Sequence, residues 1–169
     1  SPGVGGVCLR KDPYLYYESS SQTNTQAELA LLGRKVNEQM PIYIFKKIEN
    51  FIKKTKKQVN DIKIFIIGFA FKGEPETSDM RDSTTLEMVQ LIKNLTSWEI
   101  FGYDPIITKG EIEKLEIKGV SLQEGFQDAD CVLIMNNHRS YGDIDILGLL
   151  QRMKKPALLF DGWHLFPLK

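Results

Sequence analysis

The chain has few cysteines, no excess of either charge and no long hydrophobic run. Its 169 residues include only Cys8 and Cys131, so a disulfide framework is not expected and a reducing cytoplasmic compartment fits best. The 22 basic and 22 acidic residues cancel, which gives no reason to expect nucleic acid or an acidic membrane as partner. No apolar run reaches the length of a membrane span, and the first residues lack the pattern of a secretory signal.

The GxGxxG dinucleotide fingerprint is also missing. Gly68 ends an apolar run, as the first glycine of that motif would, but Phe69-Ala70-Phe71-Lys72 follows it. This part of the chain is therefore not expected to hold a pyrophosphate by the usual glycine turn. No metal site is expected either.

Short apolar runs alternate with helical patterns from residue 61 onward. The run Lys63–Phe71 is nearly all apolar, as a strand buried on both faces should be. Further strands are expected at residues 99–103, 131–135 and 157–160, and helices at 83–94, 109–115, 122–128 and 144–153. This alternation predicts an α/β fold with a Rossmann-like, doubly wound parallel sheet, whose ligands bind beyond the carboxyl ends of the strands.

A long helical segment precedes the predicted sheet. Apolar residues recur three or four positions apart between residues 25 and 57, at Leu29, Leu32, Val36, Met40, Ile44, Ile48 and Ile52. Pro41 removes a backbone donor, so we expect a kink or two helices there. The continuous stripe needs a covering surface, supplied by the following domain or by a second copy of the chain. The chain thus divides into a helical part, residues 1–60, and a sheet domain, residues 61–169.

The first dozen residues, SPGVGGVCLRKD, form a glycine-rich turn that ends in Cys8 and Asp12. Glycines let the backbone approach a ligand closely. Asp12 and Pro13 have the pattern of an N-cap and a first helical residue, which predicts a short helix over residues 14–20. Cys8 would then precede a helix N-terminus, with basic neighbours, and the thiolate nucleophile would be favoured. A buried cysteine in a structural turn is the alternative.

Basic side chains flank the loop that follows the first predicted strand. Lys72 and Arg81 lie between that strand and the next helix N-terminus, an arrangement suited to phosphate oxygens. Arg81 could instead form an ion pair with Asp79 or Asp82. Asp104, at the end of the next strand, is interpreted as structural.

Several motifs resemble, in the same order along the chain, those of the UDP-glucose/GDP-mannose dehydrogenase family, the nucleotide-sugar 6-dehydrogenases. They are GVGGVCLRKD, GRKVNEQMP, IIGFAFKGEPETSDMRDS, FGYDP, ADCVLIM and FDGW. The resemblance covers essentially the whole chain. It implies a central helix that builds a homodimer and a C-terminal Rossmann-like domain that binds a UDP-sugar. The NAD-binding domain of the family would precede Ser1, so we expect this chain to be a C-terminal fragment.

The resemblance also implies an activity. The family oxidises the C6 alcohol of a nucleotide sugar twice, with NAD as the cofactor, to a uronate that serves as a precursor of acidic polysaccharides. Cys8 matches the nucleophile that forms a thiohemiacetal and then a thioester, and Asp12 matches the aspartate that helps activate water. Lys11 matches a position against the cofactor and could lower the pKa of the cysteine. Without an NAD-binding domain the fragment alone is predicted to be inactive.

Residues that bind the substrate are implied in the same way. Gly3, Val4 and Gly5 match the loop that wraps the sugar through backbone contacts. Phe71 and Lys72 match substrate contacts, with Lys72 near the diphosphate.

Two further positions complete the implied site. Arg81 matches an arginine that reaches the cofactor from this domain, and Trp163 stands where the family often has arginine, so that it could pack or stack on the nucleotide. Val7 differs from the histidine of many enzymes acting on N-acetylated sugars, whereas the Lys11-Asp12 pair is similar to the glucose enzymes; the sugar is therefore not named. The alternatives are a non-catalytic, dimeric UDP-sugar-binding module and a purely structural domain.

Overall fold

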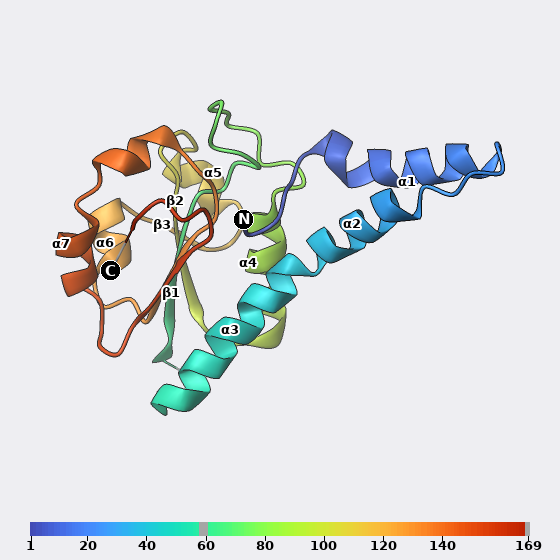
Figure 1. Cartoon of the computed structure of the whole chain (residues 1–169). Coiled ribbons are helices and arrows are strands. Elements are labelled where there is room, and N and C mark those ends of the chain that lie inside the picture. The colour runs from blue at the N-terminus through green and yellow to red at the C-terminus, as the bar shows by residue number, and fades with distance from the viewer. Residues whose placement is uncertain (58–60, 168–169) are drawn as a thin grey trace.

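A five-stranded parallel sheet forms the centre of the computed structural model, which describes residues 1–57 and 61–167 (Figure 1). The strands are β1 Lys63–Ile67, β2 Glu99–Tyr103, β3 Lys118–Gly119, β4 Cys131–Ile134 and β5 Leu158–Asp161. Their order is β3-β2-β1-β4-β5, and Ile64 of β1 lies opposite Ile100 of β2 and Cys131 of β4. The predicted doubly wound α/β fold is confirmed. The switch in strand order lies between β1 and β4, which is where ligands of such sheets bind.

Strand β1 is shorter than the apolar run that predicted it. The run continues to Phe71, but the strand ends at Ile67 because Gly68 turns the chain with a φ of 94°. Beyond that turn, the carboxylate of Asp104 accepts hydrogen bonds from the backbone N–H groups of Phe69 at 2.7 Å and Ala70 at 3.3 Å. Asp104 therefore has the structural role expected of it.

Helices cover both faces of the sheet (Figure 1). They are α3 Met40–Thr55, α4 Thr84–Leu95, α5 Lys109–Glu113, α6 Leu122–Phe126 and α7 Ile146–Gln151. Successive β1 residues point to opposite faces: Ile64 and Ile66 pack with α3 and α4, whereas Phe65 and Ile67 pack with α6 and α7. Each face therefore has an apolar core of its own. No helix among the described residues has both the length and the apolar character needed to cross a membrane.

The long helical segment is two helices, as Pro41 predicted. Helix α2, Glu28–Glu38, ends where α3 begins, with Gln39 between them. The apolar stripe divides at the same point. Ile44 and Ile48 of α3 are fully buried against the sheet domain, whereas Leu29 of α2 is 83% exposed.

Helix α1, Val7–Ser21, begins earlier than predicted. Gly6, with a φ of 101°, is the N-cap, so the expectation that Asp12 caps the helix is wrong. The glycine adopts the backbone conformation that precedes the helix. Pro13 lies inside the helix, where it removes one backbone donor and crowds the carbonyl group of Leu9. Together α1 and α2 form an arm that projects from the sheet domain (Figure 1).

Candidate functional site

The glycine-rich loop before α1 lies against the carboxyl edge of the sheet (Figure 1). A Cβ atom on Gly5 would stand 2.4 Å from the carbonyl oxygen of Asp82, which also accepts a hydrogen bond from the N–H of Gly6 at 3.2 Å. After β5, a Cβ on Gly162 would stand 2.8 Å from Pro2. Only residues without side chains permit this approach, so the glycines bring the start of the chain onto the predicted ligand edge.

Cys8 is the second residue of α1 and is exposed. It therefore lies within the first helical turn, not before the helix, and the partial positive charge of that helix end surrounds it. Asp12 follows four residues later, on the same face of the helix. Both the expected nucleophile and the expected water-activating carboxylate thus face one side of α1.

Lys11 is directed to Asp12. Its Nζ lies 2.7 Å from Asp12 Oδ1, and this hydrogen bond raises the pKa of the exposed Lys11 ammonium group. Within residues 1–57 and 61–167, no hydrogen bond or ion pair joins these three side chains to Lys72 or Trp163.

Phe71 connects the two halves of the candidate site. Its ring lies so close to Gly6 that a Cβ there would stand 3.1 Å from two ring carbons, and its N–H donates to the carbonyl oxygen of Asp79 at 3.0 Å. The Nζ of Lys72 lies 5.4 Å from the centroid of the same ring. The structure therefore brings the glycine loop and the Phe71-Lys72 pair together, although they are far apart in sequence.

Arg81 forms an ion pair with Asp79, one of the two acidic partners considered for it from the sequence. Its guanidinium donates to both carboxylate oxygens of Asp79, from Nε at 2.9 and 3.1 Å and from Nη2 at 2.7 Å. These bonds lower the pKa of Asp79 to about 2. The Arg81 side chain is 75% exposed, so the contact with a cofactor stays a prediction.

Trp163 packs against the end of β4. Its indole Nε1 donates to the carbonyl oxygen of Met135 at 3.0 Å, and its backbone N–H donates to Asp161 at 3.1 Å. The ring is half-buried and its nitrogen is engaged, which favours packing over a hydrogen bond to a nucleotide. A stacking contact through the ring face stays a prediction.

Polar groups after β4 also reach this edge, although no sequence motif marks them. Asn137 accepts a hydrogen bond from the N–H of Gly73 at 3.2 Å. His138 is buried; its Nδ1 accepts from the N–H of Ser140 at 3.3 Å, and its Nε2 lies 3.5 Å from Glu76 Oε1. The only signal for them was their position directly after a predicted strand.

A family model described as the UDP-glucose/GDP-mannose dehydrogenase family, UDP binding domain, matches residues 65–167. The chain belongs to this family. The match covers the sheet domain from β1 to the last described residue, and it confirms the resemblance drawn from the motifs. No group of three or more His, Cys, Asp or Glu side chains within the described residues could hold a metal ion in this family member.

Relatives of the family extend the likeness beyond the sheet domain. The UDP-N-acetyl-D-mannosamine dehydrogenase of Pyrococcus horikoshii is 29% identical over 160 residues, which are 95% of this chain and 35% of that protein. The same-named enzyme of Methanocaldococcus jannaschii is 30% identical over 162 residues, covering 94% and 34%. The solved P. horikoshii structure aligns with a TM-score of 0.80 at 26% identity, over 99% of this chain and 36% of that one. This chain spans about a third of the length of the curated relatives that it matches.

Proposed function

We propose that this chain is the part of an NAD-dependent UDP-sugar 6-dehydrogenase that binds the UDP-sugar and supplies the catalytic cysteine. The complete enzyme would oxidise the C6 alcohol to a uronate in the cytoplasm, as a precursor of acidic polysaccharide. The observation that carries the proposal is the contact between Gly6, two residues before Cys8, and Phe71, beside Lys72, in a chain of this family. One contact thus joins the proposed nucleophile loop to the proposed diphosphate site.

The proposed chemistry uses Cys8 as nucleophile at the aldehyde stage. Its thiolate attacks the carbonyl carbon and forms a C–S bond, while the electron pair of the C=O π bond moves to the oxygen and gives a thiohemiacetal anion. The oxygen then re-forms the C=O bond as a hydride leaves the carbon, and a thioester results. Water breaks the C–S bond, giving the carboxylate and releasing the thiol, and Asp12 would take the proton from that water. NAD, when bound, would accept the hydride of each oxidation, and Lys11 and Arg81 are the residues proposed to contact it.

Substrate binding is proposed for the residues that meet at the carboxyl edge. The backbone of Gly3, Val4 and Gly5 would surround the sugar. Lys72 would neutralise the diphosphate, Phe71 would contact the substrate, and the ring face of Trp163 would pack on the nucleotide.

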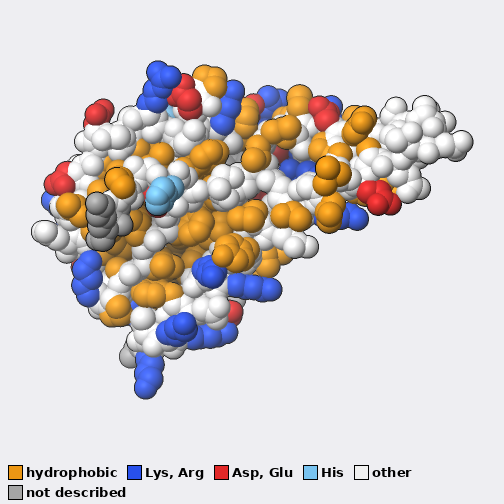
Figure 2. Space-filling model, viewed as in Figure 1, with side chains coloured by type: hydrophobic (Ala, Val, Ile, Leu, Met, Phe, Trp, Pro, Cys, Tyr) orange, Lys and Arg blue, Asp and Glu red, His pale blue; other side chains and the backbone are white. Residues whose placement is uncertain are grey.

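The exposed stripe on α2 supports a homodimer. Leu29, Leu32 and Val36 are 83%, 58% and 56% exposed, and hydrophobic side chains appear on the surface along the arm in Figure 2. We propose that residues 1–60 carry the cysteine loop and this dimer surface, and residues 61–169 the UDP-sugar-binding domain. The further proposed partner is an NAD-binding domain that would supply the hydride acceptor.

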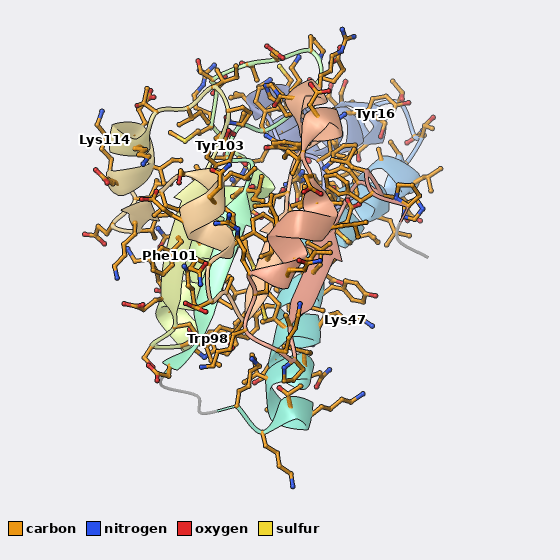
Figure 3. All side chains as sticks on the ribbon, turned by 90° about the vertical axis from the view of Figure 1, so that its left-hand side faces the viewer. Tyr16, Lys47, Trp98, Phe101, Tyr103 and Lys114 are labelled. Carbon is orange, nitrogen blue, oxygen red and sulfur yellow. The ribbon has the colours of Figure 1, made fainter. Side chains whose placement is uncertain are left out.

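Calorimetry with UDP, UDP-glucose and UDP-N-acetylmannosamine tests the binding proposal. Lys72→Ala should weaken binding of all three by roughly tenfold or more, because a hydrogen bond to a charged group contributes about 1.5–3 kcal/mol. Lys114→Ala is the control, since Lys114 is an exposed lysine at the C-terminal end of α5 (Figure 3) and has no role in the proposed site. Equal binding by wild type and Lys72→Ala would contradict the assignment.

A second assay tests whether the chain needs a hydride-accepting domain. The isolated chain, mixed with a UDP-sugar and NAD, should give no steady formation of NADH. Sustained turnover would refute this expectation.

A further inference from the structure

The last turn and a half of α2 presents polar side chains to the glycine loop. Arg34, Asn37 and Glu38 are spaced by three and four positions, so they share one face of the helix. Asn37 forms two hydrogen bonds with one residue of the loop: Val4 N–H donates to Oδ1 at 2.7 Å, and Nδ2 donates to the Val4 carbonyl oxygen at 2.9 Å. Because a backbone N–H can only donate, this pairing also fixes the orientation of the amide. The side chain therefore pairs with Val4 as a neighbouring strand would.

Hydrogen bonds to Glu38 fix the other polar side chains on this face of α2. The Arg34 side chain is 6% exposed; its Nε donates to Glu38 Oε1 at 2.9 Å and its Nη1 reaches the Val4 carbonyl oxygen at 3.5 Å. Glu38 in turn accepts hydrogen bonds from the hydroxyl of Tyr14 in α1, at 3.1 and 3.0 Å. This hydrogen-bond network restricts the motion of the helix segment that carries Asn37.

The opposite side of the loop is held by the sheet domain. Gly6 donates to the carbonyl oxygen of Asp82, and a Cβ on Gly3 would stand 2.8 Å from Thr84 and 3.4 Å from Met40. Three glycines give this loop many conformations to lose, so it needs several restraints to adopt one. Asn37 is the side chain that supplies two of them from outside the sheet domain.

We propose that Asn37 is a positioning residue for the sugar half of the substrate. It acts through Val4 and sets where the Gly3–Gly5 backbone stands over the carboxyl edge of the sheet, while the UDP half is held by the sheet domain. The inference rests on the proposed function, because it takes the sugar to lie against this loop. It predicts that Asn37 controls the gain in affinity that the sugar adds to UDP, and not the affinity for UDP itself.

The test compares UDP with UDP-N-acetylmannosamine and UDP-glucose by calorimetry on the whole chain. Asn37→Leu removes both hydrogen bonds at similar size, and Asn37→Asp keeps the acceptor but puts a carboxylate oxygen against the Val4 carbonyl. Both variants should reduce the sugar-dependent gain in affinity by roughly fivefold or more, the change expected for the loss of one net hydrogen bond. Asn50→Asp on the exposed face of α3 is the matched control and should change nothing.

Hydrogen exchange supplies a readout that needs no ligand. The amides of Val4 and Gly6 should exchange faster in Asn37→Leu, while those of β1 and β4 stay as protected as in the wild type. Unchanged exchange in the loop, an equal loss of affinity for UDP and UDP-sugar, or no sugar-dependent gain in the wild type would each overturn the inference. A wild-type chain that binds no UDP at all would contradict the proposed function and this inference with it.

Discussion

The arm and the sheet domain are stabilised by different forces. In the sheet domain, Ile48 of α3 is fully buried in an apolar cluster. In the arm, none of the α1 residues, all of which are described, is buried, and α2 buries only Arg34. Helix α2 nevertheless continues the same apolar stripe as α3. A stripe in the sequence thus predicts a helix, but the tertiary structure decides which part of the stripe is covered.

Polar contacts attach the arm to the sheet domain. Arg10 of α1 reaches Asp82 at 2.7 Å and Glu87 of α4 at 3.3 Å. Asn37 of α2 also bonds to Val4 of the glycine loop, whose Gly6 donates a hydrogen bond to Asp82. The arm therefore depends on directional bonds at its base. These bonds suit a part of the molecule that positions a loop, because each fixes a particular atom and not merely a buried area.

The largest difference between the two regions should appear on truncation of the stripe. Ile48→Ala removes a fully buried side chain and should lower the free energy of unfolding by about 2–5 kcal/mol. Leu32→Ala in the arm should change it by less than about 0.5 kcal/mol at protein concentrations where the chain is monomeric, because Leu32 is exposed in the single chain. Urea unfolding followed by circular dichroism measures both. Equal decreases in the free energy of unfolding for the two variants would show that Leu32 is packed as tightly as a core residue.

A glycine in the sheet domain gives the next effect. A Cβ on Gly125 of α6 would stand 2.1 Å from the ring of Phe65, which is fully buried, so Gly125→Ala forces the ring or the helix to move. We expect a loss of about 1–3 kcal/mol in urea unfolding. Stability equal to that of the wild type would mean that α6 can shift away from β1 without cost.

Four of the five strands of the sheet domain could be predicted because each is a mainly apolar run. The range 99–103 was predicted with its observed bounds, and only the two-residue β3 was too short to leave a pattern. The start of α1 could not be predicted from its capping pattern, because the positive φ of Gly6 starts the helix before Asp12 can. The expectation for Pro41 held, since proline acts through its own backbone.

The candidate site was only partly visible in the sequence. Glycine, Cys8 and Lys72 have residue types that indicate chemistry. Asn37 and Asn137 are ordinary polar residues whose partners are backbone atoms of distant segments, so no spacing marks them. Contact between Gly6 and Phe71 likewise depends on the tertiary structure alone.

The two cysteines allow the regions to be compared by pH. Burial raises the pKa of the Cys131 thiol to about 12 from its ordinary value of 9.0, whereas Cys8 in the arm is exposed. Between these two pKa values the thiol stays protonated in the folded state but ionises in the unfolded state, which favours unfolding. The contribution of Cys131 to the free energy of unfolding is therefore complete below pH 9 and is lost between pH 9 and about pH 12.

Between neutral pH and pH 10, the free energy of unfolding of the wild-type chain should therefore fall by about 1 kcal/mol more than that of Cys131→Ala. Urea unfolding of both proteins measures this difference. Thiol labelling should count one reactive group in the native chain, Cys8, and a second after unfolding. Native labelling of both thiols would contradict the burial of Cys131.

The smallest effect should come from Gly33→Ala in α2. A Cβ there would meet nothing within 4 Å, so the substitution should stabilise the helix by about 0.5–1 kcal/mol through the lower entropy of the unfolded chain. If the arm opens independently of the core, the gain should appear as slower hydrogen exchange of α2 amides and leave the urea midpoint unchanged. Gly110→Ala in α5 is the matched control, since it too faces open space but lies in the sheet domain and should raise the midpoint. If both substitutions raised the urea midpoint equally, the arm would unfold cooperatively with the core. If Gly33→Ala lowered stability, and did so more at higher protein concentration, Gly33 would lie in contact with a second copy of the chain.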